Sequence, residues 1–79
     1  MIRALIADDH AVVRDGLRLL LETQPGIDIV GEAGDGRDAI RQVAQLSPDV
    51  VLMDIAMPGL NGIEATRKIS EEHQSSKVL

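Results

Sequence analysis

Apolar and polar positions along the chain fall into two alternating patterns. Short apolar runs predict buried strands at residues 2–7 and 50–53, and residues 27–33 alternate around Ile29 and Val30 as another strand. Between these runs, apolar residues recur at every third or fourth position, which predicts amphipathic helices. The apolar positions of the three helices are Val13, Leu17, Leu20 and Leu21, then Ala39, Ile40, Val43 and Ala44, and finally Ile63, Thr66 and Ile69, expected to point inward. Strands that alternate with helices predict an α/β fold built from βαβ units.

Turn and capping residues separate these segments. Asp8 or Asp9 is expected to cap the first helix, and residues 34–36 predict a turn before the second. Residues 77–79 begin a further strand, which is shorter than strands usually are. We therefore expect the chain to be truncated after the start of its fourth strand.

Composition limits the classes of partner. A chain of 79 residues forms at most one small domain. Its 13 acidic and 8 basic residues give a net charge of −5 and no basic stripe, so we expect no direct nucleic acid contact by this segment. The absence of cysteine excludes a disulfide scaffold, and the apolar stretch at residues 4–7 is too short for a signal peptide or membrane span. A cytoplasmic location without a membrane partner fits these features.

The candidate chemistry lies at the ends of two predicted strands. Asp8 and Asp9 follow the first apolar run, and Asp54 follows the run at residues 50–53. If the two strands are parallel and adjacent, their carboxyl ends open into one crevice. Two carboxylates about 5 Å apart repel by roughly 3 kcal/mol at an effective dielectric of about 20, so this trio needs protons or a cation. Mg²⁺ prefers carboxylate oxygens and keeps waters that a phosphate can displace, so the residues predict a Mg²⁺-assisted site for an anion.

Simpler interpretations exist for each residue alone. Taken alone, an aspartate at each of these positions is interpreted as a helix cap or a turn residue. His10 is interpreted as a solvent-facing residue of the first helical turn, in preference to a metal ligand. The arginines are interpreted as solvated faces and ion pairs, part of which could meet a partner protein; they are Arg14, Arg18, Arg37 and Arg41.

Four motifs, in this order and spacing, carry a resemblance. They are LIADDH at residues 5–10, RDGL at 14–17, GEAGDG at 31–36 and MDIAMPGLNGIEA at 53–65. Together they resemble the receiver domain of bacterial two-component response regulators, most closely the NarL/FixJ (LuxR-type) group. The resemblance covers the whole chain and implies a flavodoxin-like fold, a three-layer parallel sheet of strand order 2-1-3-4-5. Residues 1–79 would be the amino-terminal part of that domain, the first three βα units and the start of the fourth strand, with no output domain.

The resemblance also implies a function and assigns residues to it. A sensor histidine kinase would donate a phosphoryl group to Asp54, so the chain is expected to be a phosphoacceptor and not an enzyme. Mg²⁺ would be held by Asp9, Asp54 and the backbone carbonyl of Ala56, with Asp8 assisting through water or directly. In the full-length parent, the receiver would control a DNA-binding output domain.

Two other functions remain open from the sequence. The family's Ser or Thr after the fourth strand and Lys after the fifth have no counterpart here, and Lys77 does not match that lysine. The chain could therefore be a receiver that cannot switch and acts only as an interaction or dimerisation module. In either case we expect it to self-associate as a homo-oligomer, through the strand at residues 50–54, which would lie at or near the edge of the sheet, or through residues 78–79. A phosphatase of the haloacid dehalogenase type is disfavoured, because its second aspartate would fall at Ala56.

Overall fold

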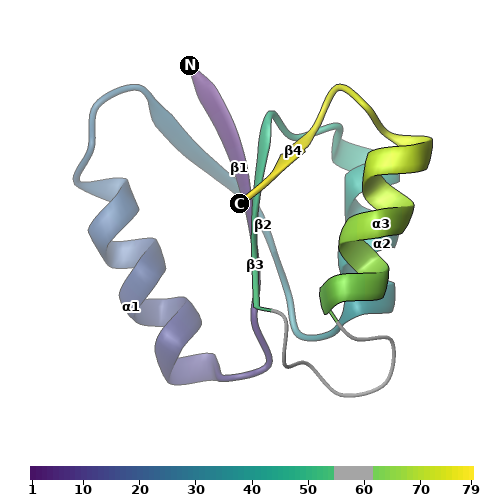
Figure 1. Ribbon diagram of the computed structural model, residues 1–79. Helices are drawn as coiled ribbons and strands as arrows, with labels where there is room; N and C mark the ends of the chain where they lie inside the picture. Colours follow the sequence, from purple (N-terminus) through teal and green to yellow (C-terminus); the bar gives the residue numbers. More distant parts are fainter. Residues whose placement is uncertain (55–61) are drawn as a thin grey trace.

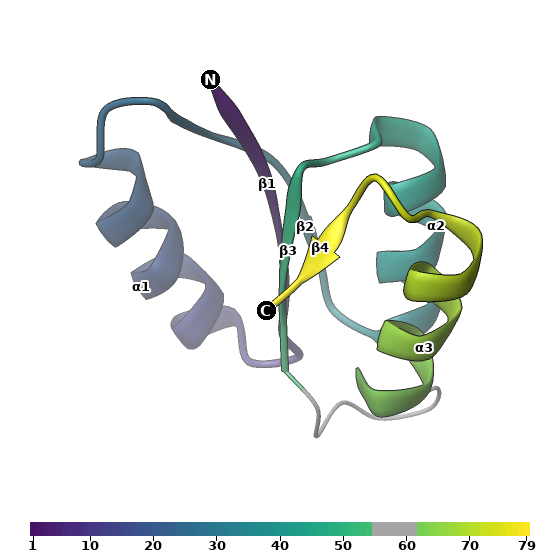
Figure 2. The same cartoon turned by 45° about the horizontal axis from the view of Figure 1, so that its top comes forward.

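A parallel sheet with helices on both faces forms the framework of the computed structural model, which describes residues 1–54 and 62–79 (Figure 1). The elements are β1 (Ile2–Ala7), α1 (Ala11–Glu22), β2 (Ile27–Ala33), α2 (Gly36–Leu46), β3 (Val50–Met53), α3 (Gly62–Glu72) and β4 (Lys77–Val78). The strand order is β2-β1-β3-β4, and each neighbouring pair is parallel. Helix α1 covers one face, while α2 and α3 lie side by side on the other (Figures 1 and 2). The predicted α/β architecture and its flavodoxin-like strand order are confirmed.

The core lies between the sheet and the pair formed by α2 and α3. It consists of small and branched aliphatic side chains, since the chain has no aromatic residue. Its fully buried members are Leu5, Ala7, Ala33, Ala39, Val43, Val51 and Ile69. These side chains pin the carboxyl-terminal halves of β1 and β2 beneath α2, and so fix the edge of the sheet where the aspartates emerge.

The face under α1 is packed much less fully. None of the residues of α1 is buried. Leu17 and Leu21 are half-buried against the sheet, but Leu20 remains 61% exposed and Val13 47%. The predicted apolar stripe of α1 therefore exists, and half of it contacts solvent. An apolar hollow lies next to this stripe, between Leu21 and the first residues of the strands.

The outer edge of the sheet is short. β4 pairs with Val50 and Val51 of β3, and Leu79 extends this pairing by donating to the Val51 carbonyl at 2.8 Å and accepting from the Met53 amide at 3.1 Å. β3 is thus one narrow strand away from the edge, as expected from the sequence.

The pairing of β1 with β2 contains a register shift. Ala4 is aligned with Ile29, but the next residue, Leu5, is aligned with Gly31, so the alignment skips Val30. Pairing then continues regularly to the ends of both strands.

Three expectations about side-chain orientation and capping are wrong. The N-cap of α1 is His10, which makes no side-chain capping hydrogen bond. The Asp8 carboxylate, which was expected to cap the helix, accepts a hydrogen bond from the His10 amide instead. On α3, Ile63 is 66% exposed, and the inward face is formed by Gly62, Ala65 and Ile69. On α2, Ala44 is exposed while Ala39 and Val43 are buried. α2 and α3 pack against each other as well as on the sheet, and small residues between the two helices allow them to approach closely. A pattern of hydrophobic residues does not predict this contact between helices.

None of the helices in the described part of the chain has the length and apolar character needed to cross a bilayer.

Candidate functional site

The site begins where two neighbouring parallel strands end. Ala7 of β1 is aligned with Met53 of β3, so the residues that follow, Asp8 and Asp54, leave the sheet side by side. Backbone hydrogen bonds fix both positions: the Asp54 amide donates to the Ala7 carbonyl at 2.9 Å, and the Asp8 amide donates to the Ala33 carbonyl at 3.0 Å. The adjacency on which the sequence argument depended is confirmed.

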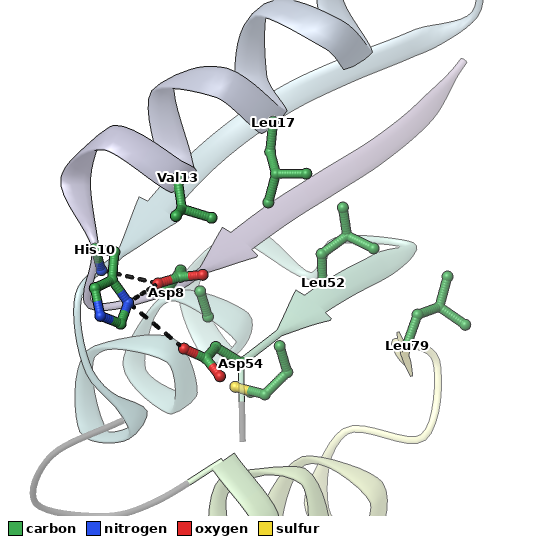
Figure 3. A pocket seen from close by; sticks show the side chains of 9 residues that line it. Asp8, His10, Val13, Leu17, Leu52, Asp54 and Leu79 are labelled. Atoms are coloured by element: carbon green, nitrogen blue, oxygen red, sulfur yellow. Dashed lines mark hydrogen bonds and ion pairs between the residues drawn. The ribbon is translucent and has the colours of Figure 1, made fainter. Parts of the chain in front are cut away.

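Four side chains converge at this edge. Asp8, Asp9, His10 and Asp54 each present one possible ligand atom, and these atoms all lie within 4.8 Å of one another. The Asp8 side chain is the most enclosed, at 12% exposed, while those of Asp9 and Asp54 are about one quarter exposed. The cluster lies at one end of a groove whose apolar wall is shared by α1, β3 and the end of the chain (Figure 3). Solvent and a small anion can therefore reach the carboxylates from the groove.

His10 is solvent-facing, as interpreted from the sequence, but it is the N-cap of α1 and its ring also contacts the acidic cluster. Its side chain is 64% exposed, and its Nδ1 lies 3.0 Å from Oδ1 of Asp8 and 3.9 Å from Oδ2 of Asp54 (Figure 3). The same atom lies 2.9 Å from Oδ1 of Asp9. The hydrogen bond to Asp8 and the negative charge of Asp9 raise the pKa of His10, against a smaller opposing effect of desolvation. When it is protonated, which the raised pKa favours, the imidazole places a positive charge beside the carboxylates.

Asp8 is held in its ionised form. Desolvation by itself raises the pKa of this carboxyl. Hydrogen bonds from the backbone and the ring of His10, with the positive charges of His10 and Arg14, outweigh this effect and lower the pKa below its usual value. A carboxylate that is ionised at neutral pH is the form that binds a cation.

The donor set fits a hard divalent cation. Three carboxylates with convergent oxygens match the ligands that Mg²⁺ prefers, and the remaining coordination positions are of the kind Mg²⁺ fills with water or phosphate. Asp8, Asp9 and Asp54 are brought together as the sequence predicted. Ala56, whose carbonyl was predicted as a further ligand, lies outside the described residues.

Arg14 is a second contributor that sequence reasoning missed. It was interpreted as part of the solvated faces and ion pairs. It does form an ion pair, with Glu32, but its side chain is only 23% exposed and its Nη1 also donates to the Asp8 carbonyl at 2.5 Å. The available signal was its spacing, because a long side chain near the start of α1 can reach back to the loop that precedes the helix, which contains Asp8.

A parallel sheet of order β2-β1-β3-β4, with aspartates clustered beyond β1 and β3, defines an α/β domain of the receiver class. Consistent with this, the chain belongs to the response regulator receiver domain family, whose sequence pattern matches residues 4–79. Curated relatives include the transcriptional regulatory protein LiaR of Bacillus subtilis (strain 168), which is 51% identical over all 79 residues. The response regulator UvrY of Escherichia coli (strain K12) is 48% identical over the same length. The chain spans only 37% of LiaR and 36% of UvrY.

Solved receiver structures superpose closely on this fold. The response regulator domain of Thermotoga maritima CheB gives a TM-score of 0.93 at 42% identity, covering 99% of this chain and 57% of that one. The isolated REC domain of RcsB from Salmonella enterica serovar Typhimurium, solved with the phosphomimetic BeF₃⁻, gives 0.90 at 31% identity, covering 98% of this chain and 58% of that one. The chain therefore corresponds to somewhat more than half of a solved receiver domain.

Proposed function

We propose that this chain is the phosphoacceptor part of a two-component receiver, with Asp54 as the residue that becomes phosphorylated. The observation that carries the proposal is the convergence of Asp54 with Asp8 and Asp9, within 4.8 Å, at the ends of adjacent parallel strands. Membership of the receiver family and the phosphomimetic on the RcsB relative support it. In this proposal Asp54 is the nucleophile, and Asp8 and Asp9 provide the metal-binding carboxylates.

The proposed step transfers a phosphoryl group from a histidine of the kinase to the carboxylate of Asp54. A carboxylate oxygen of Asp54 forms a bond to phosphorus as the P–N bond of a phosphohistidine on the kinase breaks, and the electron pair of that bond returns to the departing imidazole. Asp54 is held for an in-line approach because its amide is bonded to the Ala7 carbonyl and its strand is fixed against β1. Asp9, Asp54 and the Ala56 carbonyl would hold Mg²⁺, with Asp8 acting directly or through water. When bound, the ion supplies charge neutralisation between the carboxylates and the incoming phosphoryl group.

The test is the intact mass of the chain after incubation with Mg²⁺ and acetyl phosphate. We expect a single phosphoryl adduct in the wild type and none in Asp54→Asn, which keeps the size of the side chain and removes the nucleophilic oxygen. An adduct that persists in Asp54→Asn, or no adduct on a wild-type sample whose circular dichroism is that of a folded α/β protein, would contradict the proposal.

The partners follow from this assignment. We propose a sensor histidine kinase as the phosphoryl donor, a cytoplasmic location, and a DNA-binding output domain in the full-length parent. Relatives favour the last point, since LiaR is a transcriptional regulatory protein and RcsB has been solved bound to the rprA promoter. The net charge of −5 on this segment argues that any DNA contact belongs to the output domain.

A second candidate function rests on the uncovered face. Half of the apolar stripe of α1 is exposed, and Ile2 at the start of β1 and Leu79 after β4 are 50% and 72% exposed. This apolar surface favours a self-associating module in which a second copy of the chain covers α1 and the edge formed by β3 and β4. Sedimentation velocity at micromolar concentration checks this: we expect species larger than the monomer, and a compact, cooperatively folding monomer would contradict it.

A further inference from the structure

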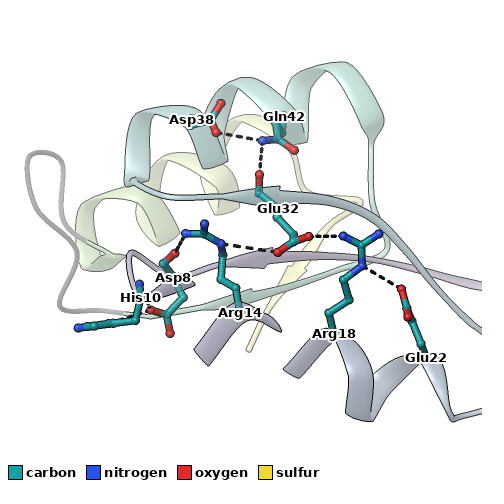
Figure 4. A network of polar contacts seen from close by, with 8 residues as sticks. All are labelled: Asp8, His10, Arg14, Arg18, Glu22, Glu32, Asp38 and Gln42. Carbon is teal, nitrogen blue, oxygen red and sulfur yellow. Dashed lines mark hydrogen bonds and ion pairs between the residues drawn. The ribbon is translucent and has the colours of Figure 1, made fainter. Parts of the chain in front are cut away.

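Arg14 links the acidic site to the body of the sheet. We infer that Arg14 is a positioning residue, which holds the turn carrying Asp8 and Asp9 by binding the Asp8 carbonyl while Glu32 of β2 anchors its guanidinium (Figure 4). The consequence for metal binding rests on the function proposed above. The effect on the turn itself does not.

The contacts of Arg14 identify it as an enclosed structural cation. Its Nη1 donates to the Asp8 carbonyl at 2.5 Å, and its Nε lies 3.6 Å from Oε1 of Glu32. Both side chains are less than one quarter exposed. The buried Nε has no hydrogen-bond partner among the residues that the structure describes, so the charge of Glu32 compensates its desolvation. A merely solvated arginine would not bury this atom.

Glu32 is itself fixed from both sides of the sheet. Arg18 of α1 donates to its Oε2 at 2.5 Å, and the side-chain amide of Gln42 on α2 donates to its backbone carbonyl at 2.7 Å (Figure 4). Gln42 also donates to Asp38 at 3.0 Å, within its own helix. The anchor of the Arg14 guanidinium is therefore part of the sheet and not a freely rotating surface carboxylate.

The peptide units around Asp8 are thus held at both ends. The Asp8 amide donates to the Ala33 carbonyl of β2, and its own carbonyl accepts from Arg14, which is anchored on β2 one residue earlier. The direction of the Asp9 side chain depends on the same peptide, because it is the next residue. Groups that orient metal ligands typically change metal affinity by about 10- to 100-fold when they are removed.

Arg18 provides a matched control for Arg14. Both arginines lie on α1 and both pair with Glu32, but Arg18 takes Glu22 as its second partner where Arg14 takes the Asp8 carbonyl. Arg14→Gln and Arg18→Gln therefore remove the same charge from the same helix, and only the first releases the turn.

The experiment compares both variants with the wild type in two measurements. In metal-free solution, amide hydrogen exchange by NMR reports on Asp8 and His10. In the second measurement, Mg²⁺ is titrated and the dissociation constant is obtained by calorimetry. We expect Arg14→Gln to exchange faster at these amides and to bind Mg²⁺ about tenfold more weakly or worse, and Arg18→Gln to stay within about twofold of the wild type in both.

The outcomes separate this inference from the proposed function. Unchanged exchange at Asp8 and His10 in Arg14→Gln overturns the positioning role, and so does an equal loss of Mg²⁺ affinity in both variants. If the wild type binds no Mg²⁺, the proposed function of the site fails, while faster exchange confined to Arg14→Gln still supports Arg14 as the residue that holds the turn.

Discussion

At the residue scale, two cations of different kinds balance the carboxylate of Asp8. Arg14 is a permanent charge fixed on the sheet side, whereas His10 is exposed and carries a charge only when it is protonated. Desolvation raises the pKa of Asp8, but the hydrogen bonds from the backbone and ring of His10, together with these two charges, outweigh it and lower the pKa. The metal-free cluster therefore contains one counter-charge that is always present and one that depends on pH.

The protonation of His10 predicts a pH dependence for the metal-free chain. Because the folded-state pKa of His10 is raised above its ordinary value of 6.5, its contribution to stability is fully present below that value and is lost as pH rises through the folded pKa. We expect the urea midpoint to fall across this window, with the ring titrating above 6.5 by NMR. His10→Asn should remove that part of the pH dependence, and a ring that titrates below 6.5 would contradict the prediction.

At the scale of elements, α2 crosses β2 at very close range. A Cβ built on Gly31 would lie 2.3 Å from Oε1 of Gln42, 3.0 Å from Leu5 Cδ1 and 3.1 Å from Leu46 Cδ1. Gly31, the first glycine of the GEAGDG motif, therefore avoids crowding against side chains of α2 and β1. It leaves the space in which Gln42 reaches the backbone of β2.

Gly31→Ala is expected to destabilise the fold by about 1–3 kcal/mol, because Gln42 must move and the leucines must yield. Gly16→Ala is the matched control: Gly16 lies within α1 and its Cβ would meet nothing within 4 Å. That substitution should stabilise by about 0.5–1 kcal/mol, since alanine favours a helix. Urea unfolding of both variants measures the difference, and a Gly31→Ala protein as stable as the wild type would rule out the close packing described.

Periodicity was sufficient to predict the strands, and it failed where tertiary contacts decide. The expected strand boundaries agree with β1, β2 and β3, because buried strands such as β1 and β3 need apolar runs and β2 shows the alternation of a strand. Asp8 and Asp54 could be paired from the sequence because parallel neighbours end at the same edge. The exposure of Ile63 could not be predicted from the sequence, since it depends on how α3 packs against α2. The approach of His10 to Asp54 and the pairing of Arg14 with Glu32 also could not be predicted, since the fold alone brings these residues together.

At the scale of the whole molecule, the two faces of the sheet differ in how well they are covered. The face beneath α2 and α3 carries the closed core, whereas the face beneath α1 retains apolar hollows that reach the outer strand. The face beneath α1 is not empty, since Ile6 of β1 has no exposed surface, but most of the apolar surface left exposed lies on this side.

A pair of leucine substitutions tests this asymmetry. Leu5→Ala, at a position with no exposed surface, is expected to cost about 2–5 kcal/mol. Leu20→Ala, at a position 61% exposed in the single chain, is expected to change the free energy of unfolding by less than about 0.5 kcal/mol in dilute solution. A cost for Leu20→Ala that grows with protein concentration would indicate that a second copy buries this leucine. A large cost at every concentration would contradict the arrangement of α1 described here.

The register shift in β2 inverts the parity of that strand. Side chains normally alternate between the faces of a sheet, so Ile29 and Gly31 would share a face in a regular strand. Here Ile29 is aligned with Ala4, on the α1 side, whereas Gly31 is aligned with Leu5, in the core beneath α2. Because Val30 is skipped, odd-numbered residues face one layer in the first half of β2 and the opposite layer in the second half.

This inversion determines which face of the sheet Glu32, in the second half of β2, points toward. In an unshifted strand of the same sequence, Glu32 would be aligned with Ala7 and would face the apolar core. With the shift it is aligned with Ile6, on the side of α1, where it meets Arg14 and Arg18. The skipped residue, Val30, therefore determines which face of the sheet carries the acid. Through the contacts of Glu32 with Arg14, it also determines how the turn containing Asp8 is held to the sheet.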